Sequence, residues 1–273
     1  MPKLEIGVLI ALVDDMDEQF RHLTGLGLRH GQICSWEPQR WNPQTAESLT
    51  ESIRKAGVRV TTFWSGLPGP ATWNFTDGPT TIGLVPAEYR AERIETLKRA
   101  ADFAVQMGFP SITTHVGFLP EDPNDPRFDE TVDAIRTVAQ YCKERGLEFW
   151  FETGQETPVT LLRTIERVGT GNLGVNFDTA NVILYGKANP VDALDVIGRY
   201  VRDVHAKDGF YPTNGDELGK ECPLGEGKVD FPAFVKKLKS LGYTGTLTIE
   251  REISGEQQRI DIQKAVKLLQ PLC

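Results

Sequence analysis

Short apolar runs of strand length alternate along the chain with longer amphipathic runs rich in Ala, Leu, Glu, Arg and Lys. Short apolar runs are typical of buried strands, and apolar residues spaced three and four positions apart are typical of helices. The pattern predicts eight strands, each followed by a helical stretch: Ile6–Ala11, Gly31–Trp36, Val58–Trp64, Ser111–Val116, Glu148–Glu152, Leu173–Phe177, Val201–His205 and Gly245–Glu250. The clearest helices are expected at Glu88–Met107, Asp129–Arg145, Pro158–Val168, Phe231–Leu241 and Glu256–Leu269.

This alternation favours an α/β fold, a single (β/α)8 TIM barrel that occupies residues 1–273. Eight units give about 34 residues per unit, close to the roughly 30 that one βαβ step requires. The alternative is a doubly wound open sheet, which usually has fewer strands and a glycine-rich phosphate turn. No G-x-G-x-x-G sequence follows the first predicted strand, so the barrel is the better interpretation.

Composition and charge narrow the classes of partner. The chain has 30 Lys and Arg against 38 Asp and Glu, a net charge of −8, and no basic run, so we expect neither nucleic acid nor a membrane surface as partner. The apolar stretch at residues 6–13 is too short for a membrane span or a signal peptide. The four cysteines are widely spaced and form no C-x-x-C pair, which favours a reducing, cytoplasmic location.

The last four predicted strands each end in a residue type that binds metals: Glu152, Asp178, His205 and Glu250. In a barrel, the carboxyl ends of the strands surround one mouth, where such enzymes carry out their chemistry. Three carboxylates and one imidazole suit a hard divalent ion, so we expect one Mn²⁺ or Mg²⁺, with Co²⁺ or Zn²⁺ as alternatives. The competing interpretation is that each carboxylate caps the helix that follows it.

The sequence resembles the xylose isomerase-like TIM barrels, a superfamily that includes D-tagatose 3-epimerases, hydroxypyruvate isomerases, inosose dehydratases and zinc-dependent apurinic endonucleases. The resemblance spans nearly the whole chain and rests on short motifs: Phe151–Thr153, Asn176–Asn181, Val204–Asp208, Pro223–Gly227, Val229–Phe231 and Ile249–Glu250. It implies that Glu152, Asp178, His205 and Glu250 bind one divalent metal. It also implies that Glu152 and Glu250 act as acid and base on opposite faces of the substrate.

The resemblance does not identify the substrate. Where the epimerases carry a second glutamate, a histidine and an arginine that touch substrate, this chain has Pro158, Asn181 and Tyr211, and Glu156 lies two residues short of the glutamate position. Free-ketose epimerisation is therefore in doubt. The endonuclease branch needs five histidines as zinc ligands. This chain has four histidines in all, so that branch is set aside.

Other residues near the predicted mouth are candidates for substrate binding. His115 ends the fourth predicted strand and is expected to bind a hydroxyl group, and Asn181 occupies a substrate-contacting position of the epimerases. Lys207 either neutralises an enediolate or carboxylate or pairs with Asp208. Trp64, with Trp36 and Trp73, is expected to form a pocket wall, although core packing would explain tryptophans there nearly as well.

These observations predict a metal-dependent isomerase or epimerase of a small keto-sugar, keto-polyol or hydroxy-keto acid that works through a cis-enediolate. The alternatives are a lyase or dehydratase on a keto-polyol with the same site, and a catalytically silent barrel that binds sugar. The long connections 65–86 and 209–229 are expected to cover the mouth. The sequence does not determine which substrate is bound or whether that substrate is phosphorylated. It also does not determine the oligomeric state of the protein, for which a homo-oligomer is one alternative.

Overall fold

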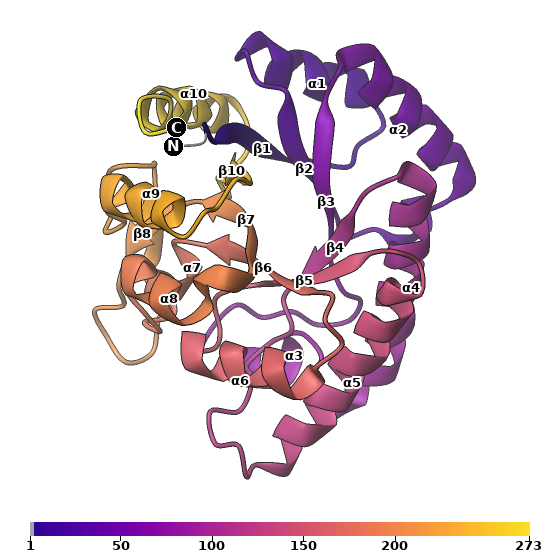
Figure 1. Ribbon diagram of the computed structural model, residues 1–273, viewed down its shortest axis with the longest axis vertical. Helices are drawn as coiled ribbons and strands as arrows, with labels where there is room; N and C mark the ends of the chain where they lie inside the picture. The colour runs from indigo at the N-terminus through magenta and orange to yellow at the C-terminus, as the bar shows by residue number, and fades with distance from the viewer. Residues whose placement is uncertain (1–2) are drawn as a thin grey trace.

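A computed structural model describes residues 3–273 of the chain. Eight parallel strands form a closed barrel in the order β1-β10-β7-β6-β5-β4-β3-β2 (Figure 1). Their bounds are β1 Glu5–Ala11, β2 His30–Ser35, β3 Arg59–Ser65, β4 Ser111–Thr114, β5 Glu148–Glu152, β6 Leu173–Asp178, β7 Val201–Ala206 and β10 Thr246–Ile249. The single TIM barrel is thus confirmed, and the open sheet is excluded because β1 pairs with β10 as well as with β2.

Helices surround the barrel on its outside (Figure 1). Their bounds are α1 Met16–Gly25, α2 Pro43–Ala56, α3 Gly78–Thr81, α4 Ala87–Met107, α5 Pro126–Lys143, α6 Pro158–Val168, α7 Asn181–Leu184, α8 Pro190–Ile197, α9 Phe231–Ser240 and α10 Glu256–Leu269, with short 3₁₀ turns at Pro38–Arg40 and Gly198–Tyr200. Many begin with a side-chain cap and a proline in the first turn, which is pre-organised for a helix start. No helix among residues 3–273 is long and apolar enough to cross a membrane.

The structure differs from the sequence-based expectations at two places near the mouth. The predicted fourth strand runs to Val116, but β4 ends at Thr114, because the backbone carbonyl of Val116 instead accepts a hydrogen bond of 2.8 Å from the Leu84 amide. The connection after β7 contains an unpredicted antiparallel hairpin, β8 (Asp208–Phe210) with β9 (Lys220–Cys222).

The apolar core lies between strands and helices, as the Phe177 and Phe234 rings from β6 and α9 illustrate with centroids 5.4 Å apart. The inside of the barrel is polar instead. Thr62 and Thr113 hydroxyls lie 2.9 Å apart, and Thr248 donates to buried Asp203 at 3.0 Å. A polar interior whose groups bond to one another can position ionisable side chains at the mouth.

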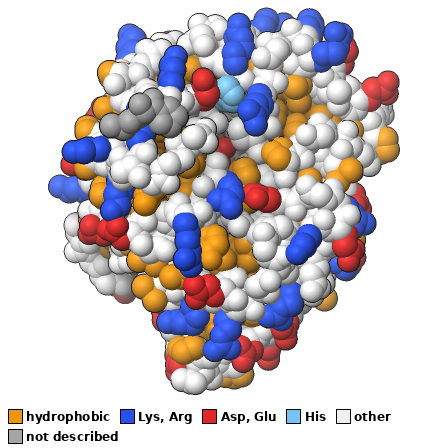
Figure 2. Space-filling view, viewed as in Figure 1, with side chains coloured by type: hydrophobic (Ala, Val, Ile, Leu, Met, Phe, Trp, Pro, Cys, Tyr) orange, Lys and Arg blue, Asp and Glu red, His pale blue; other side chains and the backbone are white. Residues whose placement is uncertain are grey.

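The start of the described chain at Lys3 and the C-terminal Cys273 lie near each other, beside β1 and α10 (Figure 1). On the face shown in Figure 2, basic and acidic side chains are interspersed, and no large patch of one sign is visible there.

Candidate metal centre and active site

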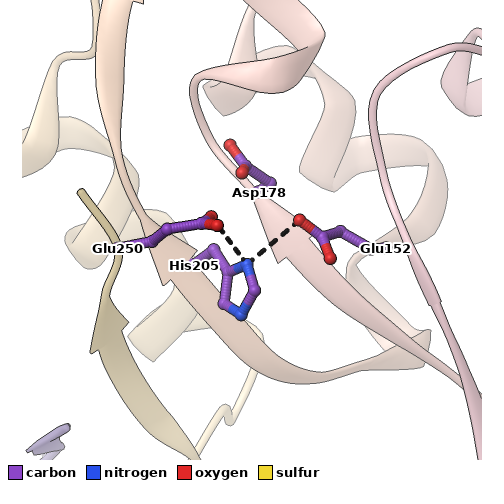
Figure 3. Close-up of side chains that lie close together, drawn as sticks. All are labelled: Glu152, Asp178, His205 and Glu250. Atoms are coloured by element: carbon purple, nitrogen blue, oxygen red, sulfur yellow. Dashed lines mark hydrogen bonds and ion pairs between the residues drawn. The ribbon is translucent and has the colours of Figure 1, made fainter. Parts of the chain in front are cut away.

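The four predicted metal-binding side chains meet at the carboxyl ends of neighbouring strands (Figure 3). Glu152 and Asp178 are the last residues of β5 and β6, His205 lies one residue before the end of β7, and Glu250 follows β10 directly. One ligand atom from each lies within 4.8 Å of the others. Glu152, Asp178 and His205 are at most 2% exposed, so the cluster is shielded from water.

The His205 imidazole is the centre of this cluster. Its Nδ1 atom lies 2.9 Å from Glu250 Oε2 and 3.1 Å from Glu152 Oε1, and the two glutamates reach it from opposite sides (Figure 3). Its Nε2 atom lies 2.9 Å from the Gln32 carbonyl oxygen, which can only accept a hydrogen bond, and 3.0 Å from the Asn176 amide nitrogen, which can only donate one. If the ring is neutral and its one proton sits on Nε2, bonded to Gln32, then the lone pair of Nδ1 faces the two carboxylates and is repelled by them. That arrangement requires a positive charge at Nδ1, either a proton or a metal ion.

Gln32 is itself held in place across the barrel. Its amide nitrogen donates to the Asn176 carbonyl oxygen at 3.0 Å, so its own carbonyl oxygen is directed to His205. Both amide side chains are fully buried. Such partners behind a ligand histidine fix its tautomer and orientation.

Asp178 performs two tasks with its two oxygens. Oδ1 accepts hydrogen bonds from the Ala180 and Asn181 amides at 2.8 and 2.7 Å, in the turn that leads into the short helix α7, whose N-cap residue is Ala180. Oδ2 is buried and has no hydrogen-bond partner, although Lys207 Nζ lies 3.4 Å away. Asp178 is therefore not the N-cap residue that the capping interpretation expected, although one oxygen binds amides at the start of α7, and the second oxygen is free to bind a cation. An orphaned buried carboxylate oxygen next to an imidazole lone pair fits a divalent metal.

The pKa shifts of the clustered side chains also indicate that positive charge is needed between the carboxylates. Burial alone would lower the pKa of His205, but Glu250 and Glu152 raise it well above its ordinary value. Burial would raise the pKa of both glutamates, yet His115 and His205 hold that of Glu152 below its ordinary value, and Lys207 and His205 do so for Glu250. The two glutamates are therefore ionised at neutral pH. Burial raises the pKa of Asp178 well above its usual range.

The four predicted substrate-binding residues all lie at this site. The Trp64 indole N–H donates to Glu152 Oε2, and His115 Nε2 lies 3.5 Å from Glu152 Oε1. The Asn181 amide nitrogen also lies 3.5 Å from Glu152 Oε1. The buried Lys207 ammonium donates to Asn181 Oδ1 at 3.2 Å.

Lys207 does not pair with Asp208, which was one of the two interpretations of its sequence position. Its ammonium instead donates to Glu252 Oε1 at 2.6 Å, and Glu250 Oε2 lies 3.6 Å away. Asp208 accepts backbone N–H bonds from the loop that closes on it. Glu252 is a site residue that the sequence analysis missed, and only its place two residues after Glu250 could have suggested it.

A cavity of about 360 Å³ opens above the cluster. Its walls include Trp36, Trp64, Trp73, His115, Tyr185 and Leu218, with Glu152 and Glu250 at its base. Trp73 and Leu218 come from the two long connections, so both contribute to the wall of the mouth as expected. A volume at the lower end of the roughly 300 to 1,000 Å³ typical of ligand pockets suits a small ligand.

The chain belongs to the xylose isomerase-like TIM barrel family, whose model matches residues 21–272. A xylose isomerase domain protein from Planctomyces limnophilus is 35% identical, with 99% of this chain and 98% of that chain covered and a TM-score of 0.92. A xylose isomerase-like TIM barrel protein from Mycobacterium smegmatis, solved in complex with magnesium, is 17% identical, with 99% and 98% covered and a TM-score of 0.71.

Enzymes share the fold at similarly low identity. The 3-keto-D-glucoside 4-epimerase from E. coli is 18% identical, with 96% of this chain and 98% of that chain covered and a TM-score of 0.71. The probable 3-DHS dehydratase from Bacillus anthracis is 17% identical, with 97% and 98% covered and a TM-score of 0.72. The uncharacterised protein MJ1311 of Methanocaldococcus jannaschii is 25% identical over 170 residues, 58% of this chain and 56% of that protein. The chain thus spans about half the length of the curated relatives it matches.

Proposed function

We propose that this protein is a divalent-metal-dependent isomerase or epimerase of a small keto-sugar, keto-polyol or hydroxy-keto acid. The observation that carries the proposal is the approach of Glu152 and Glu250 to one imidazole nitrogen from opposite sides (Figure 3), beside the orphaned Oδ2 of Asp178. The epimerase relatives of the same fold support the reaction class.

Glu152, Asp178, His205 through Nδ1, and Glu250 would hold the ion. Three carboxylates with one imidazole favour Mg²⁺ or Mn²⁺. When bound, such an ion supplies positive charge that polarises a carbonyl group and stabilises an enediolate. With Nδ1 on the ion, the remaining ring proton sits on Nε2, where the Gln32 carbonyl oxygen at 2.9 Å accepts it.

Glu152 and Glu250 move the proton in this proposal. Both are ionised, because neighbouring cations hold their pKa values below the ordinary value. A flat enediolate between them presents one face to each carboxylate, so one glutamate removes a proton and the other returns one to the opposite face. A single base would return the proton to the face from which it came.

The remaining side chains orient the reacting groups. The Trp64 N–H donates to Glu152 Oε2, and this fixes the carboxylate with Oε1 toward the cavity. His115 at the cavity wall is placed to bind a substrate hydroxyl. The buried Lys207 ammonium lies 3.6 Å from Glu250 Oε2 and thus keeps this carboxylate ionised rather than touching substrate.

The test is conversion of a panel of keto-sugars and keto-polyols in D₂O with Mn²⁺ present, followed by NMR and mass spectrometry. We expect a product that has the mass of its substrate apart from one deuterium. A product that has lost water would instead indicate the dehydratase chemistry of the Bacillus anthracis relative. Absence of both conversion and exchange across the panel would favour a silent sugar-binding barrel and contradict the proposal.

Glu152→Gln and Glu250→Gln test the two-carboxylate mechanism. Each keeps the size of the side chain and one ligand oxygen, so metal should remain while turnover falls by roughly 10² to 10⁴. One of the two should still exchange the substrate proton with D₂O without forming product. Glu47→Gln on the exposed side of α2 is the control and should leave turnover unchanged. Wild-type turnover in both site variants would mean that the pair only holds metal.

A further inference from the structure

An aromatic wall connects the proposed proton-transfer site to the surface. Trp64, whose N–H binds Glu152, has its ring centroid 5.2 Å from that of Trp36, and Trp36 lies edge-on to Trp73 at 6.3 Å. His115 closes the wall at 5.0 Å from Trp73. Trp36 and Trp73 are 48% and 40% exposed, which is unusual for tryptophan and is not needed for the chemistry at Glu152.

The backbone is built to hold Trp36 in this position. The indole lies flat on Gly66, directly after β3, and a Cβ atom at that glycine would come within 2.3 to 2.7 Å of three ring atoms. Gly66 in turn donates its N–H to the Ser35 carbonyl at 2.9 Å. One face of Trp36 is therefore packed against protein, while about half of its surface is open to solvent at the mouth.

No Lys or Arg lines the cavity, whose lining residues all belong to the described part of the chain. The cations closest to it have their donors occupied. Lys207 is bound to Glu252, and Arg251 donates to Asp261 at 2.9 Å and pairs with a second carboxylate. Arg93 donates to three backbone carbonyls of the loop after β3, at 2.7 to 3.0 Å.

The backbone amides of the loop after the seventh strand are also occupied. In TIM barrels, phosphate groups are frequently held by the loops after the seventh and eighth strands. Here Asp208 fills the loop after β7: Oδ1 accepts from Gly209 and Val229 at 2.8 and 3.1 Å, and Oδ2 accepts from Gly225 and Gly227 at 2.9 and 3.0 Å. A buried carboxylate thus occupies the amide donors that this loop could offer to a phosphate.

The charge around the cavity disfavours anions further. Glu152, Glu250 and Glu252 all line it, and with a divalent ion bound these three carboxylates and Asp178 still carry one negative charge more than the ion and the Lys207 ammonium offset. An anionic substituent placed beyond the reacting carbon would meet carboxylates and indole rings, without a cation to offset its loss of hydration.

We propose that the substrate is an uncharged pyranose with a ring keto group beside a hydroxyl, unphosphorylated and without a carboxylate, whose apolar C–H face stacks on Trp36 while Trp73, at right angles to it, borders the same ring. This inference rests on the proposed function, because it describes what the same site binds. A pyranose ring presents C–H groups on one face and hydroxyls at its edge. The Trp36 face matches the first, and His115 and Asn181 match the second.

Binding of two matched probes tests the inference: methyl β-D-glucopyranoside and methyl β-D-glucopyranoside 6-phosphate, which differ only in the phosphate. Titrations of the Mg²⁺-supplemented protein are followed by saturation-transfer NMR. We expect the neutral glycoside to bind at least tenfold more tightly than its phosphate. Equal or tighter binding of the phosphate, or no binding of either probe, overturns the inference.

Variants locate the binding. Trp36→Ala, Trp73→Ala and Gly66→Ala, which displaces the Trp36 ring, should each weaken binding of the neutral glycoside at least fivefold. Phe210→Ala is the matched control, because Phe210 is 39% exposed and does not line the cavity. Unchanged binding in all three wall variants would also overturn the inference.

The two proposals fail separately. Turnover of a phosphorylated keto-sugar that is lost in Glu152→Gln would contradict only the substrate class. Binding of the neutral glycoside to the tryptophan wall, without any turnover that depends on Glu152 or Glu250, would contradict only the proposed reaction.

Discussion

Replacing Glu156 by Gln should stabilise the protein increasingly as the pH rises. Glu156 follows β5 and is 2% exposed, and neither of its carboxylate oxygens has a hydrogen-bond partner. Burial raises its pKa to about 8, while the backbone amides of Glu156 and Gln155 and the Lys187 charge offset this only in part, and Glu121 adds to it. Glu156 therefore binds a proton at neutral pH in the folded state, whereas in the unfolded chain it is ionised.

The sign and size follow from proton linkage. A carboxyl group whose pKa is raised by folding favours the folded state least at high pH, because the folded state holds a proton that the unfolded state has released. The loss begins as the pH rises through the unfolded pKa, near 4.5, and is complete above about 8. At about 1.4 kcal/mol per pKa unit, the penalty is about 1 kcal/mol at pH 5.5, about 3 at pH 7 and between about 4 and 5 at pH 8.5. Gln has no such titration.

Urea denaturation of both proteins at these three pH values measures the effect. The stability of Glu156→Gln minus that of the wild type should increase by about 3 kcal/mol between pH 5.5 and 8.5. Glu47→Gln, which changes an exposed carboxylate on α2, should show no comparable trend. A difference between Glu156→Gln and wild type that does not depend on pH would refute the argument that Glu156 is buried as a neutral acid.

Two further predictions concern the mouth. Trp64→Phe removes the N–H that binds Glu152 while it keeps an aromatic ring. Turnover should fall by roughly tenfold to a hundredfold with metal content unchanged, since hydrogen bonds to charged groups contribute about 1.5 to 3 kcal/mol. Steady-state kinetics with elemental analysis would check this, and unchanged turnover would speak against it. The connections 66–86 and 209–229 should become resistant to limited proteolysis when methyl β-D-glucopyranoside is bound, because closure shields the reacting groups from water; equal cleavage with and without the glycoside would mean that they are not a lid.

The barrel and the metal-binding residues could be predicted from the sequence, because both depend on local patterns. Apolar runs alternate with amphipathic ones eight times, and a barrel places every strand end at one mouth. Glu152 and Asp178 needed only their positions at the ends of β5 and β6. His205 and Glu250 likewise stood at the ends of predicted strands, and the family motifs implied the same four residues.

The partners behind these residues could not be predicted in the same way. Gln32 and Asn176 lie on strands 144 residues apart, and their contact depends on the closed barrel and its register. Nothing local distinguishes Gln32 from any polar residue in a strand. The hairpin β8–β9 has three residues per strand, which is too short for a periodic signal. Glu252 was missed for a similar reason, because only the fold brings it to Lys207.

Anomalous diffraction from crystals grown with Mn²⁺ tests the central claim most directly. The account predicts one strong peak per chain, bound by oxygens of Glu152, Asp178 and Glu250 and by Nδ1 of His205, with Gln32 still on Nε2. The peak should be lost or much weakened in His205→Ala, because neighbouring groups cannot replace a missing ligand nitrogen. Absence of a peak between these four residues in the wild type, or full occupancy in His205→Ala, would contradict the account.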